Sequence, residues 1–252
     1  MSTPKLQKCR NVLDLLLLAV AFVVLWQIFF EIGGSVALAS PLQALRNALD
    51  MLGTSSFWDN AKATLTAFAI AVVVETVAGL AIGIFLGLQR FAGDLFEPML
   101  AGLYSVPKLM FFPMITLFFG IGLTSVVAFG VFQGIISIIL CTMNAVRNLK
   151  PVYLKTGRVM NLSTTQMMLT VALPGALPEI FTGLRIGISS CLIGVILCEM
   201  FGSARGLGFS LMNAMQNNIV IDIASQTLLL IVFAAALSGL LMLADYKLHR
   251  RI

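Results

Sequence analysis

The chain has 252 residues, of which 59% are hydrophobic and 11% are charged, and its formal net charge at pH 7 is +5. Soluble domains carry roughly 25% charged residues, so this chain has too few polar side chains to cover a water-soluble globule. Its mean hydropathy of +1.00 indicates that lipid surrounds much of it, which excludes a sizeable soluble domain. Because Lys and Arg mark cytoplasmic loops in membrane proteins, the positive charge does not indicate a nucleic-acid partner.

Six apolar segments are long enough to cross the roughly 30 Å of hydrocarbon in a bilayer. In chain order they cover residues 12–32, 61–88, 98–120, 124–146, 180–201 and 223–244. They predict an all-α integral membrane protein, a polytopic bundle of about six spans, and no alternation typical of strands competes with it. We divide the chain into an N-terminal span with its outer connection (1–60), a core (61–246) and a tail (247–252).

The first apolar segment allows two interpretations. Lys5, Lys8 and Arg10 precede it, and the tripeptide at 37–39 resembles a signal-peptidase site. The apolar region of a signal peptide is usually ~7–15 residues long, which is shorter than this segment. We therefore expect a retained first span, with a cleaved signal as the alternative.

The distribution of cations predicts the orientation of the spans. With a cytoplasmic N-terminus, the cytoplasmic stretches hold eleven Lys and Arg residues and the outer stretches hold three. Lys108 and Arg185 lie near span boundaries and do not affect this comparison. Under the positive-inside rule both termini are expected in the cytoplasm.

Two spans carry glycines at four-residue steps. These are Gly79, Gly83 and Gly87 in the second span, and Gly183 and Gly187 in the fifth. One face of each helix therefore has no side chains, so that another backbone can approach closely. We interpret these faces as helix-packing surfaces, with contact to a ligand as the less favoured alternative.

A short loop and an interrupted span follow the second span. Residues 89–97 are expected to form a short loop before the third span, which Pro107 and Pro113 interrupt. Broken helices are tolerated in membranes only inside protein or beside water, so this span is expected to face the bundle interior or a pathway.

The basic stretch at 147–178, between the fourth and fifth spans, is the most informative segment. Asn161 suits the left-handed residue that follows a helix, and Ser163 with Gln166 three positions later predicts a capping box. A second short helix is then expected to stop at residues 173–174. The pattern predicts a helix–turn–helix on the cytoplasmic side, with an interfacial amphipathic hairpin of no special function as the alternative.

Several short motifs surround this segment in a set order. They are Val-Pro at 106–107, Phe-Gly-Ile-Gly at 119–122, Leu-Pro-Gly-Ala-Leu-Pro at 173–178, Thr-Gly-Leu-Arg at 182–185, Glu-Met-Phe-Gly at 199–202 and Gly-Leu-Gly at 206–208. In order and spacing they resemble permease subunits of binding-protein-dependent ABC importers of the nitrate/sulfonate/taurine type. The resemblance covers most of the chain, from the second span to the sixth.

The stretch at 147–178 resembles the EAA loop of that family, whose pattern is Glu-Ala-Ala, three residues, Gly, nine residues, then Ile-x-Leu-Pro. The resemblance implies that the loop binds the ATPase subunit through the positions Lys155, Thr156, Gly157, Arg158, Asn161, Leu162, Ser163, Leu173 and Pro174. Lys155 stands where the family has glutamate and Asn161 where it has glycine. The reversed charge implies a different partner surface or weak coupling, and a second, non-identical permease with an intact loop is one explanation.

The resemblance also implies the assembly and the mechanism. It implies a type I ABC importer permease fold in the bacterial inner membrane, paired with a second permease subunit, two ATPase subunits that bind ATP-Mg, and an extracytoplasmic substrate-binding protein. Alternating access would carry a small anion or organic acid such as nitrate, a sulfonate or taurine. The sequence has no Gly-x4-Gly-Lys-Ser/Thr phosphate loop, so ATP is expected on a partner, and no cofactor is expected in this chain.

Two other classes of function remain as alternatives. An ion-coupled secondary transporter would use ionisable residues at membrane depth, for which Glu75 and Glu199 are the candidates. A membrane enzyme has little support, because the single histidine, His249, lies in the basic tail and the four cysteines show no metal-binding spacing. Polar groups suited either to a pathway or to helix packing are Glu75, Thr116, Gln133 and Asn144.

Overall fold

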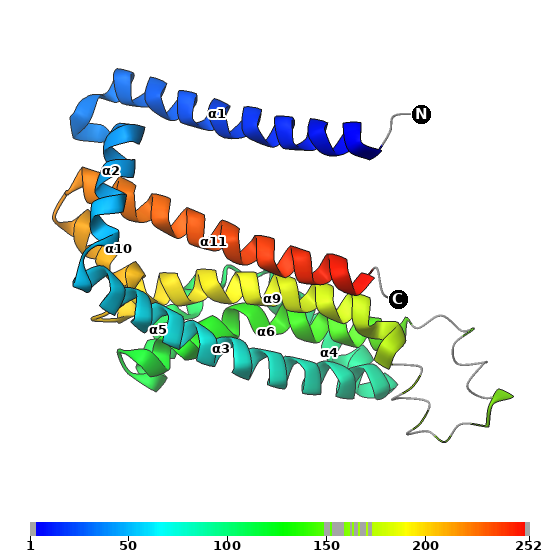
Figure 1. Ribbon diagram of the computed structural model, residues 1–252. Coiled ribbons are helices and arrows are strands. Elements are labelled where there is room, and N and C mark those ends of the chain that lie inside the picture. Colours follow the sequence, from blue (N-terminus) through cyan, green and yellow to red (C-terminus); the bar gives the residue numbers. More distant parts are fainter. Residues whose placement is uncertain are drawn as a thin grey trace. The chain divides into compact units, whose positions relative to one another are not determined.

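The computed structural model describes residues 4–148 and 173–249, together with positions 152, 159–161, 163, 166 and 170. The helices, in chain order, are α1 (Pro4–Ala37), α2 (Pro41–Leu52), α3 (Ser55–Leu88), α4 (Arg90–Ser105), the short 3₁₀ helix η1 (Lys108–Phe111), α5 (Phe112–Phe119), α6 (Leu123–Arg147), α9 (Leu173–Gly202), α10 (Leu207–Gln216) and α11 (Val220–His249) (Figure 1). The prediction of an all-helical membrane protein is confirmed for these residues.

The chain divides into two compact units. Unit 1 comprises residues Met1–Trp58 and Leu211–Ile231, and unit 2 comprises Asp59–Ser210 and Val232–Ile252. Unit 2 contains the motifs that surround the basic stretch, so the candidate site is built there.

Four of the described helices are long and apolar enough to cross a membrane. They are Ser55–Leu88, Leu123–Arg147, Pro174–Gly202 and Val220–Leu243, and a fifth span results if the bent pair Arg90–Ser105 and Lys108–Phe119 counts as one. In α1 the described side chains show an apolar helix over Val20–Gly34, so the first expected span, residues 12–32, is tested only over that part. The described part of the chain thus carries four or five of the six expected spans.

The third expected span differs most from the prediction. Residues 90–97 are not a loop but the start of α4, and the two halves of the span meet at an angle of 94°. Pro107 explains the bend, because proline lacks a backbone N–H and forces the preceding residue away from helical geometry. Val106 is accordingly extended, with φ −73° and ψ 138°.

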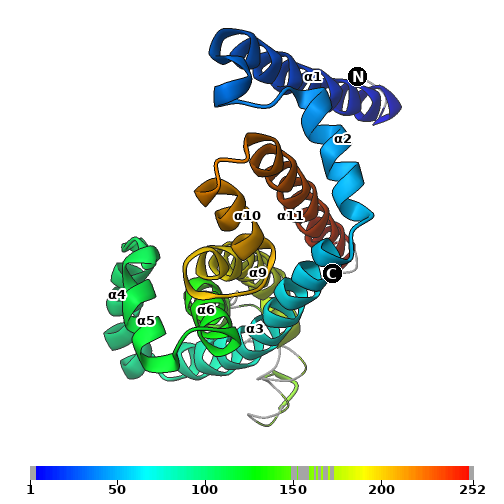
Figure 2. The same cartoon turned by 90° about the vertical axis from the view of Figure 1, so that its left-hand side faces the viewer.

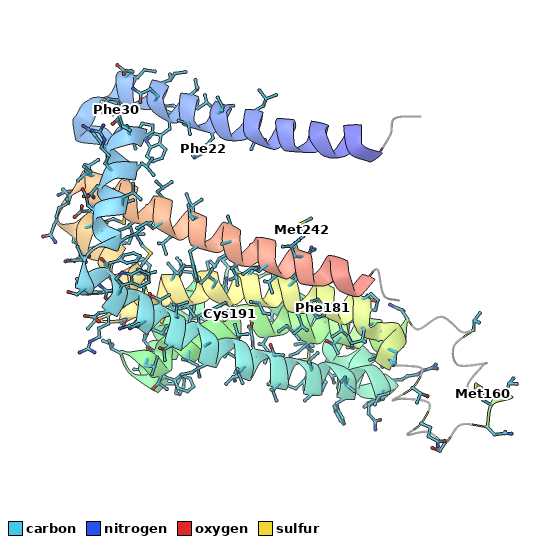
Figure 3. The ribbon with its side chains drawn as sticks, in the orientation of Figure 1. Phe22, Phe30, Met160, Phe181, Cys191 and Met242 are labelled. Atoms are coloured by element: carbon cyan, nitrogen blue, oxygen red, sulfur yellow. The ribbon has the colours of Figure 1, made fainter. Side chains whose placement is uncertain are left out.

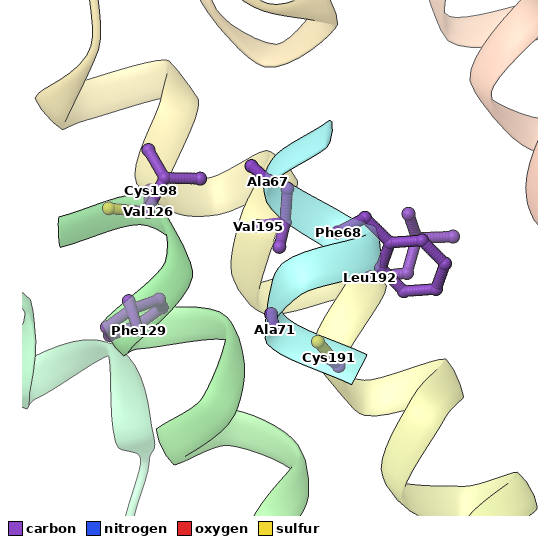
Figure 4. Close-up of a cluster of buried hydrophobic side chains, with 9 residues drawn as sticks. All are labelled: Ala67, Phe68, Ala71, Val126, Phe129, Cys191, Leu192, Val195 and Cys198. Atoms are coloured by element: carbon purple, nitrogen blue, oxygen red, sulfur yellow. The ribbon is translucent and has the colours of Figure 1, made fainter. Parts of the chain in front are cut away.

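The centre of unit 2 is an apolar core shared by α3, α6 and α9 (Figure 4). Its buried residues are Ala67, Phe68 and Ala71 of α3, Val126 and Phe129 of α6, and Cys191, Leu192, Val195 and Cys198 of α9. Both cysteines of α9 are fully buried free thiols in this cluster. They pack as small apolar side chains, as their spacing on one helix face suggests.

Glycine faces bring the helix backbones of unit 2 together around α6 (Figure 2). A Cβ placed on Gly83 would lie 2.6 Å from the Cβ of Thr142, which is too close for two carbon atoms. In the same way, Gly79 and Gly87 of α3 lie against Ile138 and Val146 of α6, and Gly183 and Gly187 of α9 lie against Cys141 and Ile138. These five glycines therefore lie at helix interfaces, with α3 and α9 both packed against α6.

Polar contacts join the helices of unit 1. Ser40 and Gln43 form a capping box at the start of α2, and Trp26 Nε1 donates a 3.0 Å hydrogen bond to the carbonyl oxygen of Ala39. Asn47 Nδ2 donates to Asp222 Oδ1 at 2.9 Å, which ties α2 to the first turns of α11.

Large apolar side chains also point outward from both units. Phe22 of α1 in unit 1 and Met242 of α11 in unit 2 are exposed (Figure 3). An outer surface of this kind is suited to lipid or to another membrane subunit.

Candidate functional site

The stretch that resembles the EAA loop lies only partly within the described residues. Lys155, Thr156, Gly157, Arg158 and Leu162 are outside them, so their expected contact with an ATPase stays a prediction. The turn between the two expected short helices is described at Asn161 and Ser163.

The turn has the predicted local geometry. Asn161 has φ 51°, which is the left-handed conformation that asparagine tolerates better than most residues. The backbone N–H of Ser163 donates to Gln166 Oε1 at 3.0 Å, and the N–H of Gln166 donates back to Ser163 Oγ at 3.3 Å. The left-handed turn and the capping box are both confirmed. Asn161 thus keeps the turn that the family builds with glycine.

The end of the stretch differs from the prediction. Leu173 and Pro174 do not terminate a separate short helix but open α9, which continues to Gly202. Proline is well tolerated in a first helical turn, where its missing N–H has no partner to lose. Pro178 lies inside the same helix. The expected fifth span therefore begins seven residues earlier, at 173 rather than 180.

Arg147 fixes the point from which the stretch leaves α6. Its guanidinium donates to Asp94 Oδ1 at 2.7 Å, to Glu97 Oε2 at 2.9 Å and to the carbonyl oxygen of Arg90 at 2.9 Å. Its side chain is 17% exposed, so this pairing is more strongly held than a fully solvated salt bridge. The contact clamps the last turn of α6 to the first turns of α4. The sequence does not predict this contact, because the charges at residues 90–97 indicate a loop.

Glu199 supports the turn between α9 and α10. Its side chain is only 2% exposed, and Oε2 accepts hydrogen bonds from Thr64 Oγ1 at 2.8 Å and from the Gly208 N–H at 3.0 Å. Gly206 has φ 119°, and a Cβ there would collide with the Glu199 carboxyl group. The motifs at 199–202 and 206–208 therefore form one structural unit, in which glycine makes room for the glutamate.

Glu75 is the second acidic residue at membrane depth. It is fully buried in α3, next to Gly134 of α6, where a Cβ would meet the Glu75 carboxyl group. Neither carboxyl oxygen has a well-formed hydrogen bond among the described groups, and the Cys191 thiol of α9, a weak donor, is its polar neighbour. A buried carboxyl group at this depth is the kind of residue on which an ion-coupled mechanism depends.

The other polar candidates have different environments. Thr116 Oγ1 donates to carbonyl oxygens of its own helix, at Phe112 and Pro113, and Asn144 is half-buried in the last turn but one of α6. The backbone carbonyl of Gln133 accepts a hydrogen bond from Lys108 Nζ at 2.7 Å. The sequence predicts Lys108 near a span boundary, but the residue lies at the break of the third span. There it contacts α6 midway along its length, at Gln133.

A comparison with protein families identifies the class of this chain. Residues 79–252 match the family described as the binding-protein-dependent transport system inner membrane component. The chain belongs to this family. It is therefore a membrane-spanning permease subunit of an ABC importer, a transport subunit rather than an enzyme, and its family implies an ATPase and a substrate-binding protein as partners.

Curated relatives agree with this assignment. The taurine transport system permease protein TauC of Escherichia coli is 29% identical over 203 residues, which is 78% of this chain and 74% of the relative. The bicarbonate transport system permease protein CmpB of Synechococcus elongatus is 30% identical over 235 residues, covering 86% of this chain and 84% of the relative.

A solved structure confirms the fold of the permease. A crystal structure of an amino acid ABC transporter with histidines matches with a TM-score of 0.64 and 17% sequence identity. The match covers 79% of this chain and 97% of the other. At this identity the likeness concerns the fold alone, and it agrees with the expected type I importer permease architecture.

Proposed function

We propose that this permease forms the pathway for a small anion or organic acid and that an ATPase drives it through the stretch at 147–178. The observation that carries the proposal is the turn at Asn161, which has the left-handed geometry and capping box expected of a coupling loop at that position. The substrate class is supported by the relatives whose names specify taurine and bicarbonate.

The turn is suited to binding a partner. Val159 and Met160 precede it and are 82% and 65% exposed. Apolar side chains this exposed at a polar, basic turn favour contact with another protein surface. The residues of the stretch that the family implies at such a contact, Lys155 among them, keep this role as a proposal.

The Arg147 clamp supplies a mechanical link between this stretch and the spans. Because Arg147 joins the last turn of α6 to α4, displacement of the stretch at the end of α6 acts on two helices together. In this scheme ATP-Mg is bound by two partner ATPase subunits, whose closure shifts the population of the permease toward the outward-facing state.

The remaining features of the assembly follow from the same scheme. A second permease subunit, identical or not, completes the pathway, and an extracytoplasmic binding protein delivers the substrate. The excess of Lys and Arg in stretches that include Arg147 supports a cytoplasmic position for both termini under the positive-inside rule.

One observation favours a second candidate function. Glu75 is buried with no ion-pair partner and no polar neighbour beyond the weak Cys191 thiol donor among the described residues, and carboxyl groups at membrane depth occur in proton relays. An ion-coupled transporter is therefore the alternative. Glu199 does not favour it, because its carboxyl group is committed to Thr64 and Gly208.

Uptake into proteoliposomes distinguishes the two functions. The purified complex is reconstituted with its binding protein and offered labelled taurine, bicarbonate or nitrate. We expect uptake of at least one anion only when ATP is supplied on the ATPase side, with no uptake driven by an imposed proton or sodium gradient. Gradient-driven uptake in the absence of ATP, lost in Glu75→Gln, would contradict the proposal and support the alternative.

A further inference from the structure

The break in the third span places one cation inside unit 2. Lys108 follows Pro107 directly, at the bend of 94° between α4 and the η1–α5 arm. Its side chain is turned inward against α6, where Nζ donates to the carbonyl oxygen of Gln133 at 2.7 Å. Only 9% of the residue is exposed.

The positive charge of Lys108 has no carboxylate partner in the part of the chain that the structure describes. Its contacts there are the Gln133 carbonyl group and the ring of Tyr104, whose centroid lies 4.9 Å from Nζ. The ion pairs of Arg147 with Asp94 and Glu97 lie at the other end of α6. A carbonyl oxygen and an aromatic face both attract a cation, but neither neutralises its charge.

This environment is costly unless an anion completes it. A buried charge is normally paired, and an ionisable residue at membrane depth normally serves a substrate, an ion or a proton. An ammonium group has three N–H donors. One N–H donates to the Gln133 carbonyl oxygen, and the ammonium group also faces the Tyr104 ring. At least one N–H donor therefore remains for an oxyanion.

Neighbouring groups fit the same ligand chemistry. The Gln133 side-chain oxygen is buried without a hydrogen-bond partner among the described groups, so it can accept from a protonated group of a ligand. The same amide carries two N–H donors that suit the ligand's oxygens. Phe111 and Phe132 form an edge-to-face pair beside this position, with ring centroids 5.2 Å apart. A lysine, an amide and apolar rings together favour a small oxyanion over a cation or a large polar solute.

We infer that Lys108, held by Gln133 and Tyr104 at the break of the third span, is a contact for a small oxyanion during its passage through the permease. The inference rests on the proposed function, since it assigns a residue to the anionic substrate class named there. Substitutions in the stretch at 147–178 are expected to abolish ATPase binding, whereas substitutions of Lys108 are expected to reduce transport and leave ATPase binding intact.

Three substitutions separate the charge from the structural contact. Lys108→Met removes both the charge and the donor to Gln133, Lys108→Gln keeps an N–H donor without the charge, and Lys108→Arg keeps the charge. Lys62→Met removes an exposed cation from α3 and serves as the matched control. Each is prepared as the full importer complex with its binding protein.

The readouts are subunit composition, ATP hydrolysis stimulated by the binding protein, and ATP-driven uptake of labelled taurine, bicarbonate and nitrate. For Lys108→Met and Lys108→Gln we expect wild-type assembly and ATP hydrolysis, with uptake reduced about tenfold or more, as when one charged ligand contact is lost. Lys108→Arg should retain much of the uptake, and Lys62→Met all of it.

Each other outcome has a definite meaning. Wild-type uptake in both neutral variants overturns the inference, and so does loss of assembly in both with restoration by arginine, which would assign Lys108 to an ion pair with another subunit. If only Lys108→Met fails to assemble, uptake by Lys108→Gln decides: reduced uptake supports the inference, and wild-type uptake overturns it. A wild-type complex that takes up none of the three anions overturns the proposed substrate class itself, and this inference with it.

Discussion

Thr64 Oγ1 donates a hydrogen bond of 2.8 Å to Glu199 Oε2, and this bond joins α3 to α9 across 135 residues of sequence. Thr64 also accepts a hydrogen bond from the Leu207 N–H at 2.8 Å. Because the same carboxyl oxygen accepts from Gly208, the start of α10 is held to both helices. A glutamate that could be read as an ion relay thus serves as a structural anchor.

The anchor predicts a graded response to substitution of Glu199. Glu199→Ala leaves the Gly208 N–H without its acceptor and leaves Thr64 Oγ1 with only the Asn60 carbonyl oxygen at 3.2 Å, so it should lower the free energy of unfolding by about 2–5 kcal/mol. Glu199→Gln retains an acceptor oxygen and should lower it by less. Denaturation of the purified chain in mild detergent measures both. Equal losses in the two variants would show that the acceptor role is wrong, and loss of transport in a stable Glu199→Gln variant would revive the relay.

The glycine face of α3 predicts an overpacking effect at Gly83. A Cβ at this position meets Thr142 and the carbonyl oxygen of Ile139, so Gly83→Ala should destabilise the chain by about 1–3 kcal/mol. Gly102→Ala in α4 is the matched control, because no heavy atom lies within 4 Å of its added Cβ. There the change should be neutral or stabilising by about 0.5–1 kcal/mol, as for glycine in a helix interior. Destabilisation of equal size at both positions would contradict the packing interpretation.

The Arg147 clamp predicts a defect in coupling. Arg147→Ala leaves Asp94 and Glu97 without their shared partner and should reduce uptake per ATP hydrolysed, because α4 and α6 no longer move together. Arg147→Lys, which cannot bind both carboxylates through a planar fork, should show an intermediate ratio. Arg90→Ala removes an exposed cation from the same corner but leaves its carbonyl oxygen in place. An unchanged ratio of uptake to hydrolysis in Arg147→Ala would exclude the mechanical role.

The left-handed turn predicts which residues position 161 accepts. Asn161→Gly suits φ 51° and should preserve ATPase binding, whereas Asn161→Val, a β-branched residue, should weaken it by straining the turn. Asn218 has φ 54° between α10 and α11 and is the matched control. Asn218→Val should strain a turn of equal geometry without affecting the ATPase. Co-purification of the ATPase checks all three variants, and loss of the ATPase in both Asn161→Val and Asn218→Val would contradict a specific role for Asn161.

Local features of the fold were predictable from the sequence, and contacts between distant residues were not. Apolar length alone located α3, α6 and α11, and the rules for helix ends located the Asn161 turn and the Ser163 capping box, because each depends on a few neighbouring residues. The clamp joins Arg147 to Asp94, which lies 53 residues earlier in the chain, and no local pattern in the sequence indicates this contact. The charges of residues 90–97 suggested a loop, although in the folded chain they form a helix whose carboxylates are paired with Arg147.

Lys108 shows the same limit at the candidate pathway. Its position next to Pro107 suggested only a span boundary, since the sequence does not reveal the direction in which a broken helix turns. The bend of 94° carries the side chain back into unit 2. A cation directly after a proline inside an apolar segment is the signal that could have indicated a buried position.

The central claim, that an ATPase drives this permease through the stretch at 147–178, is tested most directly by affinity purification of the tagged chain in mild detergent. We expect an ATPase with a phosphate loop to co-purify with the wild-type chain, and to be lost when residues 155–162 are replaced together while the chain remains stable. The number of permease types in the complex would show whether the partner permease is identical. An ATPase retained after that replacement, or absent from the wild-type complex, would contradict the account.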